Sequence, residues 1–173
     1  MAPAGELWHV VEARREDGNP AMFRIRELAP RLDQPTIFVV EMPYATGELS
    51  RLPDAPAYRR LDRFEEQWLS PACSILGWTF VASKADAGSF FLYLYGAGEP
   101  GSLIERLSPF DPALGFFDEH DPTWDEYAAL RELLDQARAL PKPRAAQKAP
   151  VAKKKPVAKK KPVAKKKPAA KKR

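Results

Sequence analysis

Residues 78–95 read WTFVASKADAGSFFLYLY, and this stretch decides the fold class. Two apolar runs, Trp78 to Ser83 and Ser89 to Tyr95, flank a short connection at 84–88 that contains glycine. Apolar runs of this length on either side of a glycine-containing turn are typical of a β-hairpin. We therefore expect an antiparallel pair of strands in the middle of the chain.

The segment upstream predicts three more strands. Residues 7–13 form a β-type run that ends at the turn residues 17–20, Asp-Gly-Asn-Pro, and residues 23–28 then alternate apolar and charged side chains. Together they indicate a second hairpin. The run at 36–42 is apolar on both faces, which favours a place inside the sheet, and Pro43 ends it.

A long loop and an amphipathic helix follow. Residues 43–57 contain three prolines and a glycine, which predicts a surface loop. Between Tyr58 and Leu69 apolar residues recur every three or four positions, as in a helix that packs on a sheet. We expect Pro71 to end or kink this helix.

The segment after the central hairpin adds a short helix at 102–107, a short strand at 114–117 and a final helix. Asp121 is the expected N-cap of that helix, with Pro122 at its first position. The whole pattern predicts an α+β fold, in which an antiparallel sheet of about five strands has two or three helices packed on one face.

Charge divides the chain into two parts. The first 140 residues hold 13 basic and all 23 acidic side chains, a formal charge of −10, whereas residues 141–173 hold 15 basic side chains, a charge of +15. The sequence VAKKKP occurs three times between 151 and 168. Since valine and alanine alone bury too little surface to offset the entropy of ordering, we expect an acidic globular domain at 1–140 and a disordered tail at 141–173.

The tail carries the strongest functional signal. Clustered lysines neutralise nucleic-acid phosphates and release counterions, but they lack the fork geometry with which arginine reads guanine. We therefore expect sequence-independent binding to the phosphate backbone of DNA or RNA, with other polyanions left open. The expected phosphate-binding residues are Lys142, Arg144, Lys148, Lys153, Lys154, Lys155, Lys159, Lys160, Lys161, Lys165, Lys166, Lys167, Lys171, Lys172 and Arg173.

Two patterns in the first 140 residues suggest enzymes but have simpler explanations. Residues 96–101 match the G-x-G-x-x-G dinucleotide fingerprint, yet Glu99 would repel a pyrophosphate, which favours a plain glycine-rich turn. The acidic cluster at 118–126, with His120, could hold a divalent cation. Its spacing matches no metal motif, and acidic residues at a helix N-terminus favour the helix dipole.

Aromatic residues of one strand and a lone cysteine are further candidates for functional groups. Phe91, Tyr93 and Tyr95 share one strand face and could stack bases, but the acidic surroundings favour core packing. Nothing around His9 and Cys73 suggests a base and its nucleophile. We therefore expect no catalytic residue, no cofactor and no metal.

Part of the chain resembles a known family. Over roughly residues 7–135 it is similar to bacterial domain-of-unknown-function family 695, and the tail is similar to the arms of linker histones. The matching residues are Leu61 to Leu69 with Glu65, Gly77 to Phe80, Phe90 to Tyr95, and Asp121 to Tyr127, where Asp-Pro-x-Trp-x-x-Tyr is the most specific motif. The resemblance implies a small α+β domain of ferredoxin-like type with no established reaction.

A single cysteine excludes an intramolecular disulfide, and no signal peptide or apolar membrane span is evident, so we expect a bacterial cytoplasmic protein with association to the nucleoid. The expected function is non-enzymatic: an acidic domain that binds an unknown protein, tethered to nucleic acid by the tail. Two alternatives stay open. One is a metal-dependent enzyme that uses the 118–126 cluster, and the other is a tail that masks the acidic face of its own domain.

Overall fold

The structure is a computed structural model that describes residues 7–46 and 51–139. The chain divides into two units, Met1–Pro141 and Lys142–Arg173, and the description here concerns the first, which we call the body. The described strands are β1 (Leu7–Arg14), β2 (Pro20–Glu27), β3 (Thr36–Pro43), β4 (Thr79–Asp86), β5 (Ser89–Gly96) and β6 (Gly115–His120). The described α-helices are α1 (Ala55–Phe64), α2 (Ser70–Leu76), α3 (Pro100–Leu107) and α4 (Asp125–Ala139).

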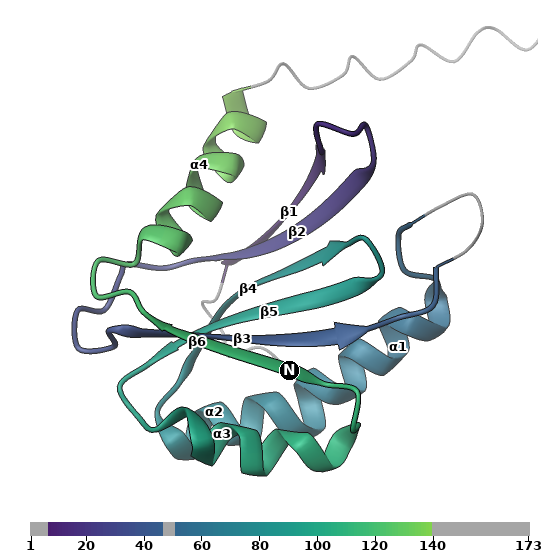
Figure 1. The fold of residues 1–173 in the computed structure, drawn as a ribbon. Coiled ribbons are helices and arrows are strands. Elements are labelled where there is room, and N and C mark those ends of the chain that lie inside the picture. The colour runs from purple at the N-terminus through teal and green to yellow at the C-terminus, as the bar shows by residue number, and fades with distance from the viewer. Residues whose placement is uncertain (1–6, 47–50, 140–173) are drawn as a thin grey trace, which may run out of the picture. The chain divides into compact units, whose positions relative to one another are not determined.

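These strands form one antiparallel sheet in the order β1-β2-β4-β5-β3-β6 (Figure 1). The predicted α+β class and both predicted hairpins are confirmed. The last strand is longer than the expected 114–117 and pairs with β3 along its whole length. As a result β3 lies between β5 and β6, inside the sheet, as its two apolar faces predicted.

The hairpin of β4 and β5 has a tighter turn than the five residues expected. Only Ala87 and Gly88 lie outside the strands, and both have positive φ, 51° and 97°. Positive φ at both central residues matches the right-handed twist of the flanking strands, which is why two-residue turns prefer it. The strands therefore extend to Asp86 and Ser89, which pair directly with each other.

The helix after β3 differs from the prediction at both ends. It begins at Ala55, inside the expected loop, because the Asp54 side chain caps it by accepting a hydrogen bond from the Ala57 N–H at 2.8 Å. It also continues past Pro71 to Leu76. A π-helical turn at Glu65–Leu69 shifts the hydrogen-bond register just before the proline, which makes room for a ring that would otherwise collide with the preceding turn.

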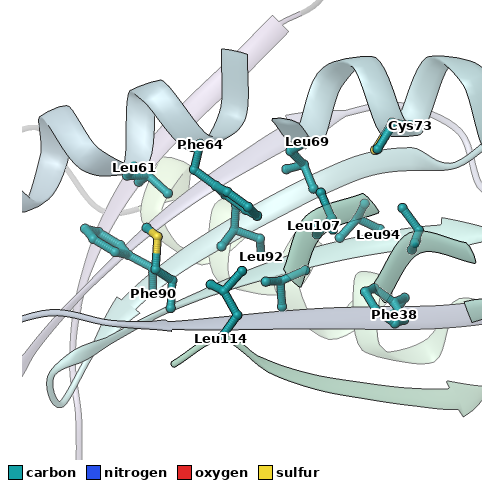
Figure 2. Close-up of a cluster of buried hydrophobic side chains, with 14 of the residues drawn as sticks. Phe38, Leu61, Phe64, Leu69, Cys73, Phe90, Leu92, Leu94, Leu107 and Leu114 are labelled. Atoms are coloured by element: carbon teal, nitrogen blue, oxygen red, sulfur yellow. The ribbon is translucent and has the colours of Figure 1, made fainter. Parts of the chain in front are cut away.

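Helices α1, α2 and α3 pack on one face of the sheet, as expected for two or three helices. Figure 2 shows the core that they close, in which side chains from the helix containing Leu61 and Phe64 meet those of β3 and β5. Its fully buried members include Phe38, Val40, Met42, Phe64, Leu69, Leu92, Leu94, Leu103 and Leu107. This face gains its stability from continuous apolar burial.

Helix α4 packs on the opposite face, where it contacts β1, β2 and β4 (Figure 1). A second buried cluster forms there, and a β-bulge between Phe80 and Ala82 turns two successive β4 residues, Val81 and Ala82, towards it. The other members include Val11, Phe23, Ile25, Tyr95, Trp124, Tyr127, Leu130 and Leu134. The sheet is thus covered on both faces, but α4 is one helix on a six-stranded surface.

The start of α4 is not where the sequence placed it. The helix begins at Asp125, and Trp124, with φ of +61°, breaks the helical path after Pro122. Asp121 still caps the helix, because its two carboxylate oxygens accept from the N–H groups of Asp125 at 2.8 Å and Glu126 at 3.2 Å. The turn at Trp124 carries its fully buried indole onto the sheet, and burial on that scale offsets the backbone strain.

Candidate functional site

The expected phosphate-binding residues, Lys142 to Arg173, lie outside the described residues, as does the expected disorder of residues 141–173. Among the described residues of the body, several basic side chains form ion pairs with carboxylates. These are Arg15, Arg24, Arg31, Arg60, Lys84, Arg131 and Arg138. Such pairing reduces the positive potential that a phosphate backbone would meet on this surface.

The glycine-rich stretch at 96–101 has a packing role. A Cβ on Gly96 would lie 2.3 Å from the Trp78 indole, and one on Gly98 would lie 3.3 Å from Trp78 Nε1. Both glycines therefore let the chain pass over a buried tryptophan. This contact explains the first two glycines of the fingerprint, whereas a Cβ on the third, Gly101, would meet no atom within 4 Å.

His9 and Cys73 lie on opposite faces of the sheet. Cys73 belongs to the core under α1 to α3, where burial raises the pKa of its thiol to about 12 and keeps it protonated. His9 is paired across the ladder with Ile25, whose side chain belongs to the core under α4. The two residues cannot act together as base and nucleophile.

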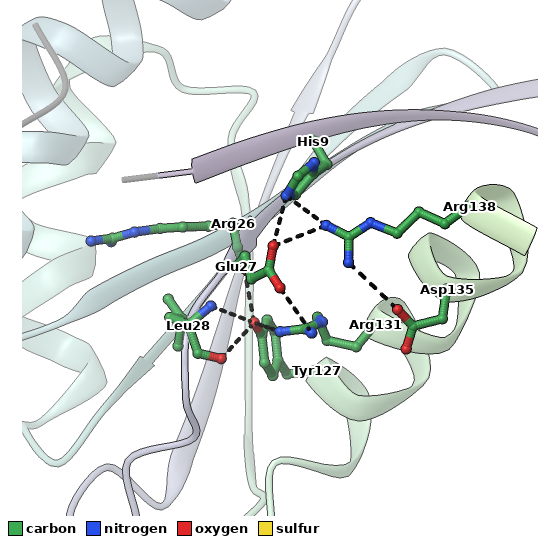
Figure 3. Close-up of polar contacts among 8 residues, drawn as sticks. All are labelled: His9, Arg26, Glu27, Leu28, Tyr127, Arg131, Asp135 and Arg138. Atoms are coloured by element: carbon green, nitrogen blue, oxygen red, sulfur yellow. Dashed lines mark hydrogen bonds and ion pairs between the residues drawn. The ribbon is translucent and has the colours of Figure 1, made fainter. Parts of the chain in front are cut away.

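His9 instead takes part in a polar network that fastens the C-terminal half of α4 to the first hairpin (Figure 3). Glu27 Oε2 lies 2.9 Å from His9 Nε2 and 2.9 Å from the Arg138 guanidinium, and its other oxygen lies 3.5 Å from Arg131. Hydrogen bonds from Arg138 and His9 hold the pKa of Glu27 below its usual range. The Tyr127 hydroxyl adds a bond to the Arg26 carbonyl at 2.8 Å. The network fixes the helix to the sheet.

The acidic cluster borders a hollow of about 380 Å³ beyond the N-terminus of α4, which we call the acidic pocket. Its floor is apolar and comes from β3 and β5, and its rim comes from β6 and the start of α4. The lining residues are Ile37, Val39, Tyr93, Phe117, Asp118, Glu119, His120, Asp121, Asp125 and Glu126. Most of the acidic cluster at 118–126 thus lies around one pocket, together with apolar residues of β3 and β5, an arrangement that the helix dipole does not explain.

Strand register assigns the side chains of β6 to its two faces. Phe117 pairs with Val39, and Glu119 pairs with Ile37, so both point to the pocket side of the sheet. Phe116, one position away, instead packs against the core under α1 to α3. Phe117 is 55% exposed, which is unusual for a phenylalanine in the middle of a strand.

Asp121 and the N-terminus of α4 are already satisfied within the body. The Tyr95 hydroxyl donates to Asp121 at 2.5 Å, and also accepts from the Tyr127 N–H at 3.2 Å. Burial alone would raise the pKa of Asp121, but the hydrogen bonds from Tyr95 and from backbone N–H groups outweigh it and hold that pKa below the usual range. This helix end therefore offers no free anion site.

The remaining rim carboxylates, on Asp118, Glu119, Asp125 and Glu126, are exposed. Among the described residues that line the pocket there is no arginine or lysine. In the part of the chain that the structure describes, no three His, Cys, Asp or Glu side chains gather in a way that could hold a metal ion. The arrangement is suited to attracting cations carried on a larger ligand.

The aromatic residues of β5 divide between the core and this pocket. Tyr95 is fully buried and stacks on Trp124, with ring centroids 4.0 Å apart, as expected for core packing. Tyr93 lines the pocket, where burial, with the nearby charges of Glu126 and Asp86, raises the pKa of its hydroxyl to about 12. Phe91 lies on the same face and is partly exposed, 5.8 Å from Lys84 Nζ.

Sequence reasoning missed Phe117 and Val39 as surface residues of a site. The available signal was the short strand after Leu114, in which Phe117 stands directly before two acidic residues.

No described helix is long and apolar enough to span a membrane. Comparison with protein-family models, with curated proteins and with solved structures found no match for this chain.

Proposed function

We propose that this chain is a non-enzymatic binding protein with two separate binding parts. The basic residues from Lys142 onward bind nucleic-acid phosphates without sequence preference, and the acidic body binds a protein partner. The observation that carries the proposal is the division of charge, −10 over the first 140 residues and +15 over the rest. The same proposal includes a cytoplasmic location, in association with the nucleoid.

Two features of the body support this division of labour. Several of its arginines are paired with its own carboxylates, which favours the tail as the part that binds phosphate. Its acidic pocket has exposed carboxylates with no arginine or lysine among the described lining residues, a surface that repels nucleic acid and attracts positively charged protein segments.

The test measures how the affinity of the full chain for a fluorescent DNA duplex depends on salt. Lys153, Lys154 and Lys155 are changed together to Gln, and the control changes the exposed body residues Arg59, Arg63 and Arg106 to Gln, which removes the same charge. Each lost phosphate contact lowers the slope of log K against log salt by about 0.9. We expect the magnitude of the slope of log K against log salt to fall by between about 2 and 3 in the tail variant, and by less than about 1 in the control.

Sequence independence is tested with the same titration. Scrambled duplexes of equal length should bind alike, because lysine contacts to phosphate carry no base information. Equal effects of the tail variant and the body variant would refute the assignment of phosphate binding to the tail. So would a body of residues 1–140 that binds as tightly as the full chain.

A further inference from the structure

Strand β6 is an edge of the sheet. It pairs with β3 on one side, and no described strand pairs with it on the other. An edge strand presents a row of backbone N–H and C=O groups that can pair with an incoming strand. The side-chain surroundings of such an edge decide which strands it accepts.

The acidic pocket lies directly beside this edge and on the same face as Phe117 and Glu119. A strand added to β6 would extend the sheet and place every second side chain over this face. There those side chains would lie next to the exposed ring of Phe117 and the carboxylate of Glu119, and Glu126 at the start of α4 would add negative charge from across the pocket. Apolar contact and charge are therefore available within one strand length.

Charge selects the occupant. Five acidic residues line the pocket, and its described lining residues include no Arg or Lys, so an incoming strand must bring its own cations. A second copy of β6 would set Asp118 and Glu119 against the same residues, and like charges on neighbouring strands are unfavourable. The same repulsion protects this edge from pairing with itself.

We propose that the free edge of β6 and the acidic pocket together bind an extended, basic segment of a partner protein by β-strand addition. Backbone pairing along β6 supplies the register, and the alternating side chains that face the pocket supply the specificity: an apolar one on Phe117 and Lys or Arg beside Glu119 and Glu126. This inference rests on the proposed role of the body in binding protein, and it names the chemistry of the partner.

The probe is a fluorescent peptide of sequence Thr-Lys-Thr-Val-Thr-Lys-Thr, whose alternate positions carry the required lysines and valine. Its binding to the full chain is measured by anisotropy at low salt. Replacing both peptide lysines with Glu should abolish binding. Methylating the backbone nitrogens at one alternate set of positions should weaken binding at least tenfold, whereas methylation at the other set should be tolerated, because a strand pairs through only one of its edges.

On the protein side, Glu119→Lys with Glu126→Lys should weaken peptide binding at least tenfold. The control, Glu105→Lys with Glu132→Lys, changes two exposed residues outside the pocket by the same charge and should reduce binding less than threefold. Phe117→Ala should also weaken binding, by about three- to tenfold, through lost apolar contact.

Failure of this inference is distinguishable from failure of the proposed function. The variant with Lys153, Lys154 and Lys155 changed to Gln, which tests nucleic-acid binding, should bind the peptide unchanged. Equal weakening by the two charge pairs, or indifference to both methylation patterns, would overturn the proposal. Peptide binding that occurs only after the tail lysines are replaced would also overturn the proposal, because the chain's own tail would then be the occupant of the site. Dimerisation of the chain through β6 would overturn it as well.

Discussion

The face of the sheet that carries α4 has two halves with opposite chemistry. In the half under α4, the acidic residue Glu27 is held by His9, Arg131 and Arg138, and the side chains beneath the helix are buried. In the half beyond the helix N-terminus, exposed carboxylates surround an apolar floor, and no arginine or lysine lies among the lining residues. The two halves share strands and differ in what covers them.

The difference between the two halves indicates that one half stabilises the fold and that the other half is available to bind a ligand. Pairing acids with bases under α4 lets the helix lie close to the sheet at little electrostatic cost. Leaving like charges together around the pocket is unfavourable in the free protein, because nearby carboxylates repel each other. A cationic ligand would relieve that repulsion. We therefore expect substitutions in the covered half to change stability, and those in the open half to change binding.

The largest effect is expected from Trp124→Ala in the covered half. The indole is fully buried, stacks on Tyr95, and donates from Nε1 to the Gln34 carbonyl at 2.9 Å. Its removal should lower the free energy of unfolding by about 3–5 kcal/mol, measured by urea denaturation. Phe117→Ala in the open half removes a ring that is 55% exposed and should cost about 1 kcal/mol or less. Equal losses would erase the distinction between the halves.

An intermediate effect is expected at Asp121, on the border between the halves. Asp121→Ala removes the cap of α4 and should cost about 0.5–2 kcal/mol at pH 7. Because the pKa of Asp121 is lower in the folded protein than the usual value, its charge stabilises the fold above that value, and the contribution is lost as the pH falls through the folded pKa.

The pH dependence gives this prediction its control. The difference in unfolding free energy between parent and Asp121→Ala should be largest at pH 7 and should shrink when both are measured near pH 3. A difference that stayed constant over this range would mean that the carboxylate charge plays no part in capping, and that the variant acts only through lost packing.

The smallest effect on stability is expected from the pocket variant Glu119→Lys with Glu126→Lys. Both residues are exposed, and the relief of repulsion among the rim carboxylates offsets the lost interaction of Glu126 with the helix dipole, so the free energy of unfolding should change by no more than about 0.5 kcal/mol. Thermal unfolding would measure this. A loss of several kcal/mol would show that the rim acids belong to the stability of the body and would remove the contrast between the two halves.

Most of the fold could be predicted from local patterns. Apolar runs beside turn residues, with alternation at 23–28, located the strands of both hairpins, and the two apolar faces of β3 placed it inside the sheet. The prediction was wrong at Pro122, which does not open α4 because Trp124 turns onto Tyr95, a contact with a distant strand. At Pro71, which was expected to end or kink its helix, the helix continues, because a π turn precedes the proline.

The acidic pocket is the clearest case of a site that could be recognised only in the tertiary structure. Its acids form one run in the sequence, but its floor comes from β3 and β5, which lie more than twenty residues away, and nothing local says that these strands stay partly uncovered. The glycines at 96 and 98 are similar, since only contact with Trp78 explains them.

Local sequence patterns were enough to predict the fold class, the two hairpins and the separation of acidic from basic charge, because periodicity and charge are properties of neighbouring residues. Only the tertiary structure decided that α4 covers the face opposite α1 to α3, that it covers half of it, and that β6 forms an edge beside the acidic pocket. Which strands become neighbours, and which surfaces remain uncovered, depends on packing between segments far apart in the chain.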